Sequence, residues 1–309
     1  MSLQCCPVFI KSIEANVNLL AAGKQMSLLI SPRIQDIGFT VKRLLPSRLK
    51  QRVGPFIFFD HMGPAHFEAG TTAGDVRQHP HIGLATVTYL FSGAMMHRDS
   101  LGIDQRIEPG AVNIMTAGSG IVHSERLPND IRENKTLVEG IQIWLALPTD
   151  VEDCEPSFTH YTAEDIPEAI LPGIKARVLI GTAFGVSSPV TTASKTTYVD
   201  VKFVAETEYQ PDFSQQELAI YVVQGEVVIN GENIPEFHVA VLDQSTIIKA
   251  KADSRIMLFG GELLAGERFV LWNFVASSRE KVREAGERWS NGGFALVPGE
   301  TDWIPLPTI

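Results

Sequence analysis

Short runs of β-branched, aromatic and aliphatic residues, separated by turn residues, make up most of the chain after residue 26. Residues 85–91 form one such run, and it ends at Ser92-Gly93. Residues 107–115 contain a Pro-Gly turn, and residues 140–147 stop at Pro148. Short apolar runs bounded by Gly, Pro, Asn and Asp are typical of β-sandwiches and β-barrels. The pattern therefore predicts an all-β fold.

The second half of the chain repeats this arrangement. Residues 218–223 form a run that ends at Gln224-Gly225, and the next run meets Asn230-Gly231, a strong hairpin signal. Further strands are expected at 196–204, 226–229, 237–242, 246–250 and 255–259.

Helical patterns are few and short. Residues 9–22 have weak helical spacing. Residues 278–289 have a stronger pattern, in which Ser277 and Glu280 resemble a capping box and Asn291-Gly292-Gly293 stops the helix. Residues 150–173 are acidic, contain proline and lack periodicity, so we interpret them as the connection between two domains.

Aligning Gly93 with Gly225 superposes the two halves and indicates an internal duplication. His79 then falls on Pro211, and Thr86 falls on Leu218. The alignment gives His81 the counterpart Phe213. The predicted organisation is an extension (1–26), a metal-binding domain (27–149), a connection (150–176), a second domain without ligands (177–275), and a helix with a tail (276–309).

Composition narrows the classes of function. The 309 residues carry a formal net charge of −10, which argues against direct binding of nucleic acid. Three cysteines, of which Cys5 and Cys6 are adjacent, form no recognisable disulfide framework, so we expect a cytoplasmic protein. No apolar run is long enough to span a membrane, and residues 15–22 are too short and too polar for a signal peptide.

Two histidine clusters carry the candidate chemistry: His79-Pro80-His81 and His123-Ser124-Glu125. Side chains alternate faces along a strand, so His79, His81, His123 and Glu125 can all point to one side. Three imidazoles and a carboxylate suit Fe(II) first, with Ni, Cu, Mn and Zn as alternatives. A six-coordinate metal would keep about two positions open for O₂ or substrate. The alternative is that surface histidines have this spacing by coincidence. His238 has no partner at ligand spacing, and we expect an ordinary hydrogen-bonded histidine there.

The spacing of these residues resembles the cupin superfamily, and more closely its pirin family. Thr86 stands where many cupins have a glutamate, and Glu125 supplies the displaced acid. Ile114 departs from the family, since many relatives have tryptophan there. The resemblance covers roughly residues 27–290 and rests on Phe58-Phe59-Asp60-His61, His79-Pro80-His81-Ile82-Gly83, Thr86-Val87-Thr88-Tyr89, His97-Arg98-Asp99-Ser100, Pro109-Gly110 and the run from Met115 to Glu125.

This resemblance implies a bicupin: two tandem jelly-roll β-barrels with few short helices and a metal in the first barrel. It also implies an activity like that of quercetin 2,3-dioxygenase, with a small flavonol-like substrate, O₂, and Glu125 as ligand or as base for the substrate hydroxyl. The alternative implied function is regulatory, through protein partners in transcription or metabolism. A third alternative is an isomerase, because fold does not fix reaction. His61, His97 and Asp99 are candidates to hydrogen-bond the ligands; the alternative for each is a hydrogen bond elsewhere in the barrel.

Overall fold

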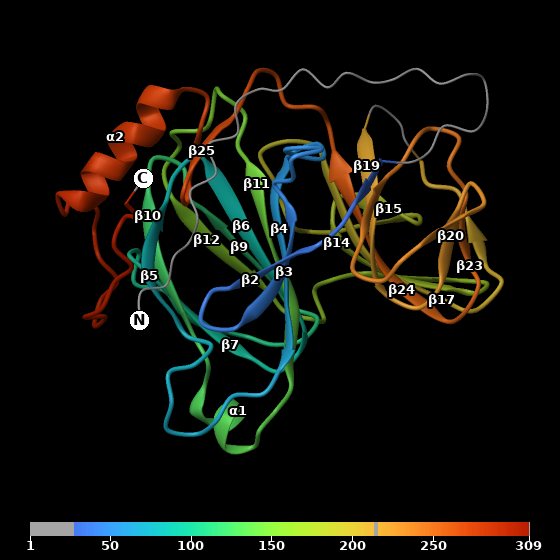
Figure 1. Ribbon diagram of the computed structural model, residues 1–309, viewed down its shortest axis with the longest axis horizontal. Helices are drawn as coiled ribbons and strands as arrows, with labels where there is room; N and C mark the ends of the chain where they lie inside the picture. The colour runs from blue at the N-terminus through green and yellow to red at the C-terminus, as the bar shows by residue number, and fades with distance from the viewer. Residues whose placement is uncertain (1–27, 213–215, 309) are drawn as a thin grey trace.

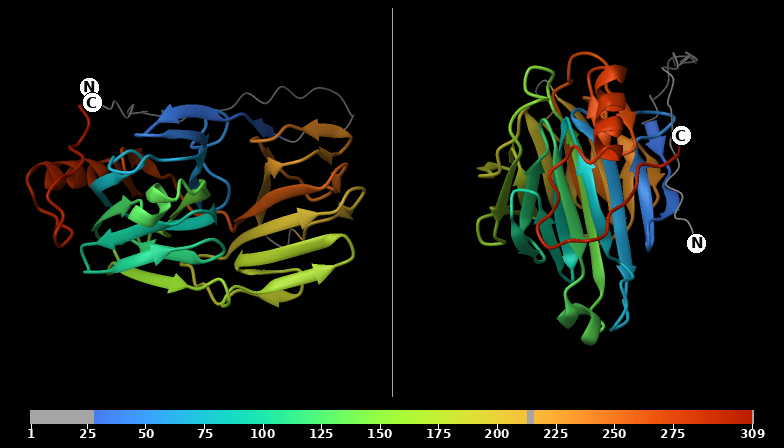
Figure 2. Two further views of the ribbon diagram at one scale, coloured as in Figure 1. Left: turned by 90° about the horizontal axis from the view of Figure 1, so that it is seen from below. Right: turned by 90° about the vertical axis from the view of Figure 1, so that its left-hand side faces the viewer.

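The computed structural model describes residues 28–212 and 216–308, so the helical pattern over residues 9–22 lies outside the described residues. Two β-rich halves lie side by side, and helix α2 covers the outer end of the first half (Figures 1 and 2). The all-β prediction is confirmed. Helices in the described ranges are limited to α1 (Asn129–Glu133) and α2 (Arg279–Ser290).

The first half consists of a large sheet and a small sheet that face each other. The order in the large sheet is β12 (Ser157–Tyr161), β9 (Val112–Thr116), β6 (Leu84–Ser92), β11 (Val138–Ala146), β4 (Phe56–Ala65), β3 (Thr40–Leu45) and β2 (Arg33–Asp36). The order in the small sheet is β5 (Val76–His81), β10 (Ile121–Arg126), β7 (Met95–Asp99) and β8 (Asp104–Ile107).

The second half has the same two-sheet arrangement. Its large sheet runs β1 (Leu28–Ile30), β22 (Val239–Val241), β19 (Glu217–Gln224), β24 (Ser254–Gly261), β17 (Thr196–Phe203), β14 (Ile174–Ile180) and β13 (Glu168–Leu171). Its small sheet runs β18 (Glu208–Tyr209), β23 (Ile248–Ala250), β20 (Val227–Ile229) and β21 (Glu232–Ile234). Two hairpins, β15 (Thr182–Ala183) with β16 (Val186–Ser187) and β25 (Phe269–Leu271) with β26 (Phe274–Ala276), complete the strands.

The strand orders of the two halves match position by position, which supports the duplication inferred from the turns. The predicted strand at 85–91 is part of β6, and the one at 218–223 is part of β19, the same place in its own sheet. The matching edge strands β12 and β1 differ in their place in the sequence. β12 follows the other strands of its barrel, whereas β1 precedes the other strands of its barrel and begins the described chain. The segment 150–173 joins the halves and gives a strand to each, β12 to the first and β13 to the second.

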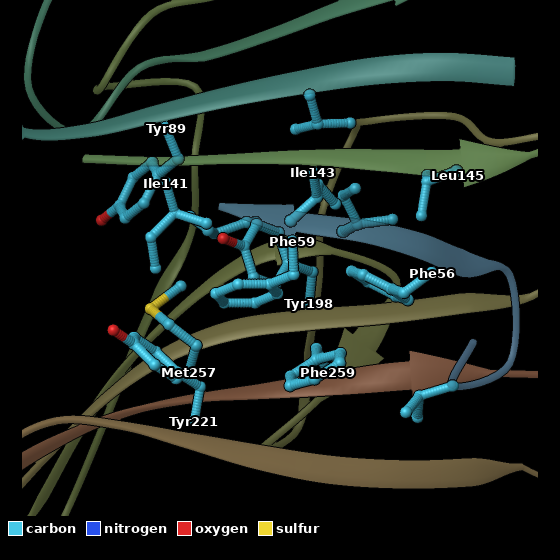
Figure 3. Close-up of a cluster of buried hydrophobic side chains, with 14 of the residues drawn as sticks. Phe56, Phe59, Tyr89, Ile141, Ile143, Leu145, Tyr198, Tyr221, Met257 and Phe259 are labelled. Carbon is cyan, nitrogen blue, oxygen red and sulfur yellow. The ribbon is translucent and has the colours of Figure 1, made fainter. Parts of the chain in front are cut away.

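The outer faces of the two large sheets pack against each other in one buried cluster. Phe56 and Phe59 contact Phe259 with ring centroids 5.1 and 5.0 Å apart, and Phe59 also contacts Tyr221 at 5.0 Å. Figure 3 shows these rings between strands of the two halves, with Ile141, Ile143 and Leu145 from β11 on one side and Met257 on the other. Aromatic pairs of this kind add to the free energy gained by burying apolar surface.

Helix α2 closes the outer side of the small sheet in the first half. Its buried Val282 and Trp289 lie in one cluster with Ile82 and Val122, which flank the histidines of β5 and β10. The predicted cap at Ser277 is wrong by one residue: Ser278 caps the helix, because its Oγ accepts a hydrogen bond from the Lys281 amide. Ser277 instead donates its Oγ–H and its amide N–H to the buried carboxylate of Glu152, at 2.6 and 2.9 Å.

Within residues 28–212 and 216–308, no helix has the length and apolar character needed to cross a bilayer.

Candidate metal centre

Two paired strands of the small sheet bring the histidines of the two sequence clusters together. β10 pairs antiparallel with β5, and His123 stands directly opposite His79 while Ile121 stands opposite His81. Alternation along each strand sends the imidazoles into the first barrel, and it sends Ile82 and Val122 toward helix α2.

The three histidines form a tight and buried group. One ring nitrogen of each of His79, His81 and His123 lies within 4.8 Å of the others. Among the residues that the structure describes, this is the cluster whose spacing could hold a metal ion. The exposed fractions of the three residues are 6%, 1% and 1%, so little water reaches them.

The hydrogen bonds of the outer ring nitrogens fix which nitrogen of each ring faces the group. His79 Nδ1–H donates to the Arg77 carbonyl at 2.8 Å, and His81 Nδ1–H donates to the Asn273 carbonyl at 3.0 Å. A carbonyl can only accept, so a neutral ring keeps its lone pair on Nε2. Asn273 lies in the turn between β25 and β26, far along the chain, and no sequence motif pointed to it.

A chain of two further residues orients His123 in the same sense. Asp99 Oδ1 accepts the amides of Leu101 and Ile103 at 2.9 and 3.2 Å, while its Oδ2 lies 3.0 Å from His97 Nε2. His97 must therefore donate from Nε2, which leaves its Nδ1 to accept from His123 Nδ1 at 3.3 Å. The lone pair of neutral His123 is thus also on Nε2.

The resulting arrangement suits a cation. His81 Nε2 and His123 Nε2 are 3.1 Å apart, so two lone pairs face each other. Burial lowers the pKa of both rings well below its usual value and the pKa of His79 to about 4, which keeps all three neutral near pH 7. Neutral imidazoles with converging lone pairs are the donor set of a divalent transition metal. These residues therefore fit the metal that the sequence predicted.

Glu125 lies beside the triad, two residues after His123 on β10. The strand pairing shifts register between His123 and Glu125. The buried carboxylate accepts a hydrogen bond from Gln142 Nε2 of β11, and burial raises its pKa. Its oxygens are outside the group that lies within 4.8 Å, so Glu125 as fourth ligand stays a prediction.

The three candidate partners of the ligands have different positions. His97 and Asp99 lie next to His123, as described above. His61 lies on the outer face of its sheet. Its Nδ1 is 2.5 Å from the hydroxyl of Tyr221 in the second half, and its Nε2 is 3.0 Å from Glu139 Oε1. It therefore belongs to the contact between the halves. Gln142 is a site residue that sequence reasoning missed, because a lone glutamine in an apolar strand gives no signal.

The second barrel has different residues at the positions that match the ligands. Pro211 follows β18, the counterpart of β5, and Phe213 lies outside the described residues. His238 Nδ1 donates to the Glu236 carbonyl at 2.9 Å, which agrees with an ordinary hydrogen-bonded histidine.

Two tandem barrels of matching strand order define a bicupin, and the buried histidine triad inside the first barrel is a site that could bind a metal ion. Residues 38–145 match the family model described as Pirin, and residues 198–295 match the model described as Pirin C-terminal cupin domain. The chain belongs to the pirin family.

Similar proteins extend over nearly the whole chain. A pirin-like protein of Caulobacter vibrioides is 42% identical over 91% of this chain and 99% of its own length. Human pirin is 29% identical over 86% of this chain and 92% of its own length. The crystal structure of a quercetin 2,3-dioxygenase from Acinetobacter baumannii covers 92% of this chain and 96% of its own, with 34% identity and a TM-score of 0.84.

Proposed function

We propose that this protein is a metal-dependent dioxygenase that acts on a flavonol or a related hydroxylated aromatic compound. The observation that carries the proposal is the convergence of three Nε2 lone pairs inside the first barrel. The likeness to a quercetin 2,3-dioxygenase at a TM-score of 0.84 supports the reaction class. Fe(II) suits the nitrogen and carboxylate donors, with Ni, Cu, Mn and Zn as alternatives.

The residues of the chain would bind the metal and accept the proton of a substrate hydroxyl. His79, His81 and His123 would be ligands, and Glu125 would be the fourth. A metal held there supplies Lewis acidity and a template on which O₂ and substrate meet. Gln142 holds the Glu125 carboxylate beside the triad, where it can accept the proton of a substrate hydroxyl.

Two partly exposed side chains mark where a substrate would reach these groups. The Gln142 side chain is partly exposed although β11 has neighbouring strands on both sides. Phe158 of the edge strand β12 is also partly exposed and stacks on His97 with centroids 4.5 Å apart. The side of the barrel interior near β11 and β12 is therefore the proposed entrance.

Oxygen uptake with quercetin tests this function. We expect metal-loaded wild-type protein to consume O₂, and His79→Ala to lose uptake together with its metal, because the triad loses a ligand. His238→Ala removes a histidine of the second barrel and should leave uptake unchanged. Glu125→Gln should lower kcat at least 100-fold if Glu125 acts as base, since general-base catalysis contributes about that much.

Two outcomes would contradict the proposal. Stoichiometric metal without uptake from quercetin or other flavonols would favour the regulatory function, in which the metal site acts through protein partners. Full turnover by a Glu125→Gln variant that retains its metal would remove Glu125 as the base.

A further inference from the structure

A continuous row of polar side chains crosses the inner face of the large sheet in the first barrel. Neighbours in the row stand directly opposite each other on adjacent strands: His160 of β12 and Asn113 of β9, Asn113 and Thr88 of β6, Thr88 and Gln142 of β11. Beyond Gln142 the row continues to Asp60 of β4 and Arg43 of β3. Six adjacent strands thus each place one polar residue at the same level.

The second barrel provides an internal control for this row. The alignment that places Gly93 on Gly225 places Thr88 on Ile220, and the same strand pairing then gives the equivalent row. That row consists of Leu29, Ala240, Ile220, Leu258, Val199 and Val178. These residues belong to the apolar core of the second barrel. The fold therefore does not require polar residues at this level.

Some members of the row have partners within it. Arg43 donates two hydrogen bonds to Asp60, at 2.8 and 2.7 Å, and His160 Nδ1–H donates to Asn113 Oδ1. Gln142 donates to Glu125. The row is therefore connected to the metal centre through the Gln142 side chain.

Asn113 has hydrogen-bonding capacity that the described residues do not use. The residue is 3% exposed, and its Nδ2 has no hydrogen-bond partner among the described residues. A buried amide N–H that lacks a partner costs free energy, so a group that accepts from it would be bound favourably. Thr88, 4% exposed, places a hydroxyl-bearing side chain between Asn113 and Gln142.

The level next to this row is mainly aromatic and apolar, with Phe158, Met115, Trp144 and Phe58 beside the single polar residue Thr86. The ring centroid of Trp144 is 5.0 Å from that of His81 and 3.9 Å from that of Phe58, on which Trp144 stacks. Phe158 stacks on His97. A planar ring near the triad would thus contact aromatic side chains on one level, and its oxygen substituents would reach polar groups on the next.

We propose that His160, Asn113, Thr88 and Gln142 form a substrate-orienting row that binds the oxygen substituents of a hydroxylated planar aromatic compound beside the metal. Asn113 Nδ2 donates to one of these oxygens, and Gln142 couples the row to Glu125. The chemical class of the ligand rests on the proposed dioxygenase function, whereas the polar row itself rests on the contrast between the two barrels.

Equilibrium binding of two flavonols without O₂ tests the row. Quercetin and 3-hydroxyflavone share the hydroxyl and carbonyl that can reach a metal, but 3-hydroxyflavone lacks the other ring hydroxyls. We expect metal-loaded wild-type protein to bind quercetin about tenfold more tightly, a typical effect of one or two buried hydrogen bonds. Asn113→Ala should bring the ratio of the two Kd values close to one, with metal content unchanged.

A second variant and a matched control keep the test decisive if Asn113→Ala folds poorly. Thr88→Val has nearly the same shape and should reduce the ratio by about threefold, since it removes one hydroxyl. Thr116→Val makes the same change on β9, on the face that points away from the barrel interior, and should leave the ratio unchanged.

The outcomes separate this inference from the proposed function. If wild-type protein prefers quercetin and Asn113→Ala loses the preference, the row stands even where no O₂ is consumed. If O₂ is consumed but both variants keep the wild-type ratio, the row is wrong and the dioxygenase proposal survives. A wild-type protein that does not distinguish the two flavonols, or binds neither, also overturns the row.

Discussion

The orientation of each ring in the histidine triad depends on an acceptor outside the triad. Two of these acceptors are backbone carbonyls, and the third is His97, which Asp99 holds in one tautomer. Because Asp99 itself accepts two backbone amides, its carboxylate cannot turn away without breaking three hydrogen bonds. Partners of this kind commonly tune metal affinity by 10- to 100-fold.

Asp99→Asn should therefore weaken metal binding about 10- to 100-fold without removing a ligand. The new amide can keep the backbone contacts through its oxygen while its NH₂ group faces His97, which reverses the tautomers of His97 and His123. His123 would then point an N–H, instead of a lone pair, toward the metal. Competition with a chelator measures the affinity, and Asp104→Asn at the exposed end of β8 is the matched control. Equal affinities in both variants would contradict the chain of hydrogen bonds.

At this scale the sequence predicts the histidines but not their surroundings. His79, His81 and His123 could be found because the two-residue period of a strand makes the His-X-His and His-X-Glu spacings meaningful. The carbonyl acceptors at Arg77 and Asn273 leave no mark in the sequence, because any residue has a carbonyl. Asn113 and Gln142 can be recognised as candidate site residues only from the strand register, which places both next to Thr88.

At the scale of elements, several strands of the large sheets were predictable, whereas the order in which the strands pair was not. The runs at 85–91, 196–204 and 218–223 correspond to β6, β17 and β19. These strands were predictable because alternating or β-branched residues between turn residues are typical of β-strands. β12 lies in the acidic segment 150–173, whose sequence lacks periodicity. It is an edge strand whose residues are all exposed or partly exposed, so its hydrophobic signal is weak. β1 pairs with β22, more than 200 residues away, and only tertiary structure defines that contact.

At the scale of the whole molecule, the two barrels differ in the residues on the inner faces of their large sheets. The outer faces of these two sheets pack against each other. The second barrel is filled with apolar side chains and packs its large sheet against that of the first barrel. Its role in this structure is to cover the outer face of the sheet whose inner face has the polar row. At the edge of that contact lies His61, which faces Glu139, Lys42, Arg255 and Tyr221.

The free energy of unfolding should depend on His61 below about pH 6.5, the usual pKa of histidine in an unfolded chain. Burial lowers the pKa of His61 in the folded state, so the unfolded state binds the proton first. Its contribution to stability is complete above pH 6.5 and declines as the pH falls toward the folded pKa. Denaturant unfolding at pH 7.5 and 5.5 measures this decline, which should be smaller in His61→Gln than in wild type. Equal declines would show that His61 does not titrate differently in the two states.

The number of metal ions bound by each chain is the decisive measurement, because the proposed function requires one metal in the first barrel and none in the second. Elemental analysis of protein saturated with Fe(II) under anaerobic conditions and then desalted should give one ion per chain. His123→Ala should give none, and His238→Ala should still give one. A wild-type protein that retains no metal, or one whose metal survives the loss of His123, would contradict the assignment of the triad as the metal centre.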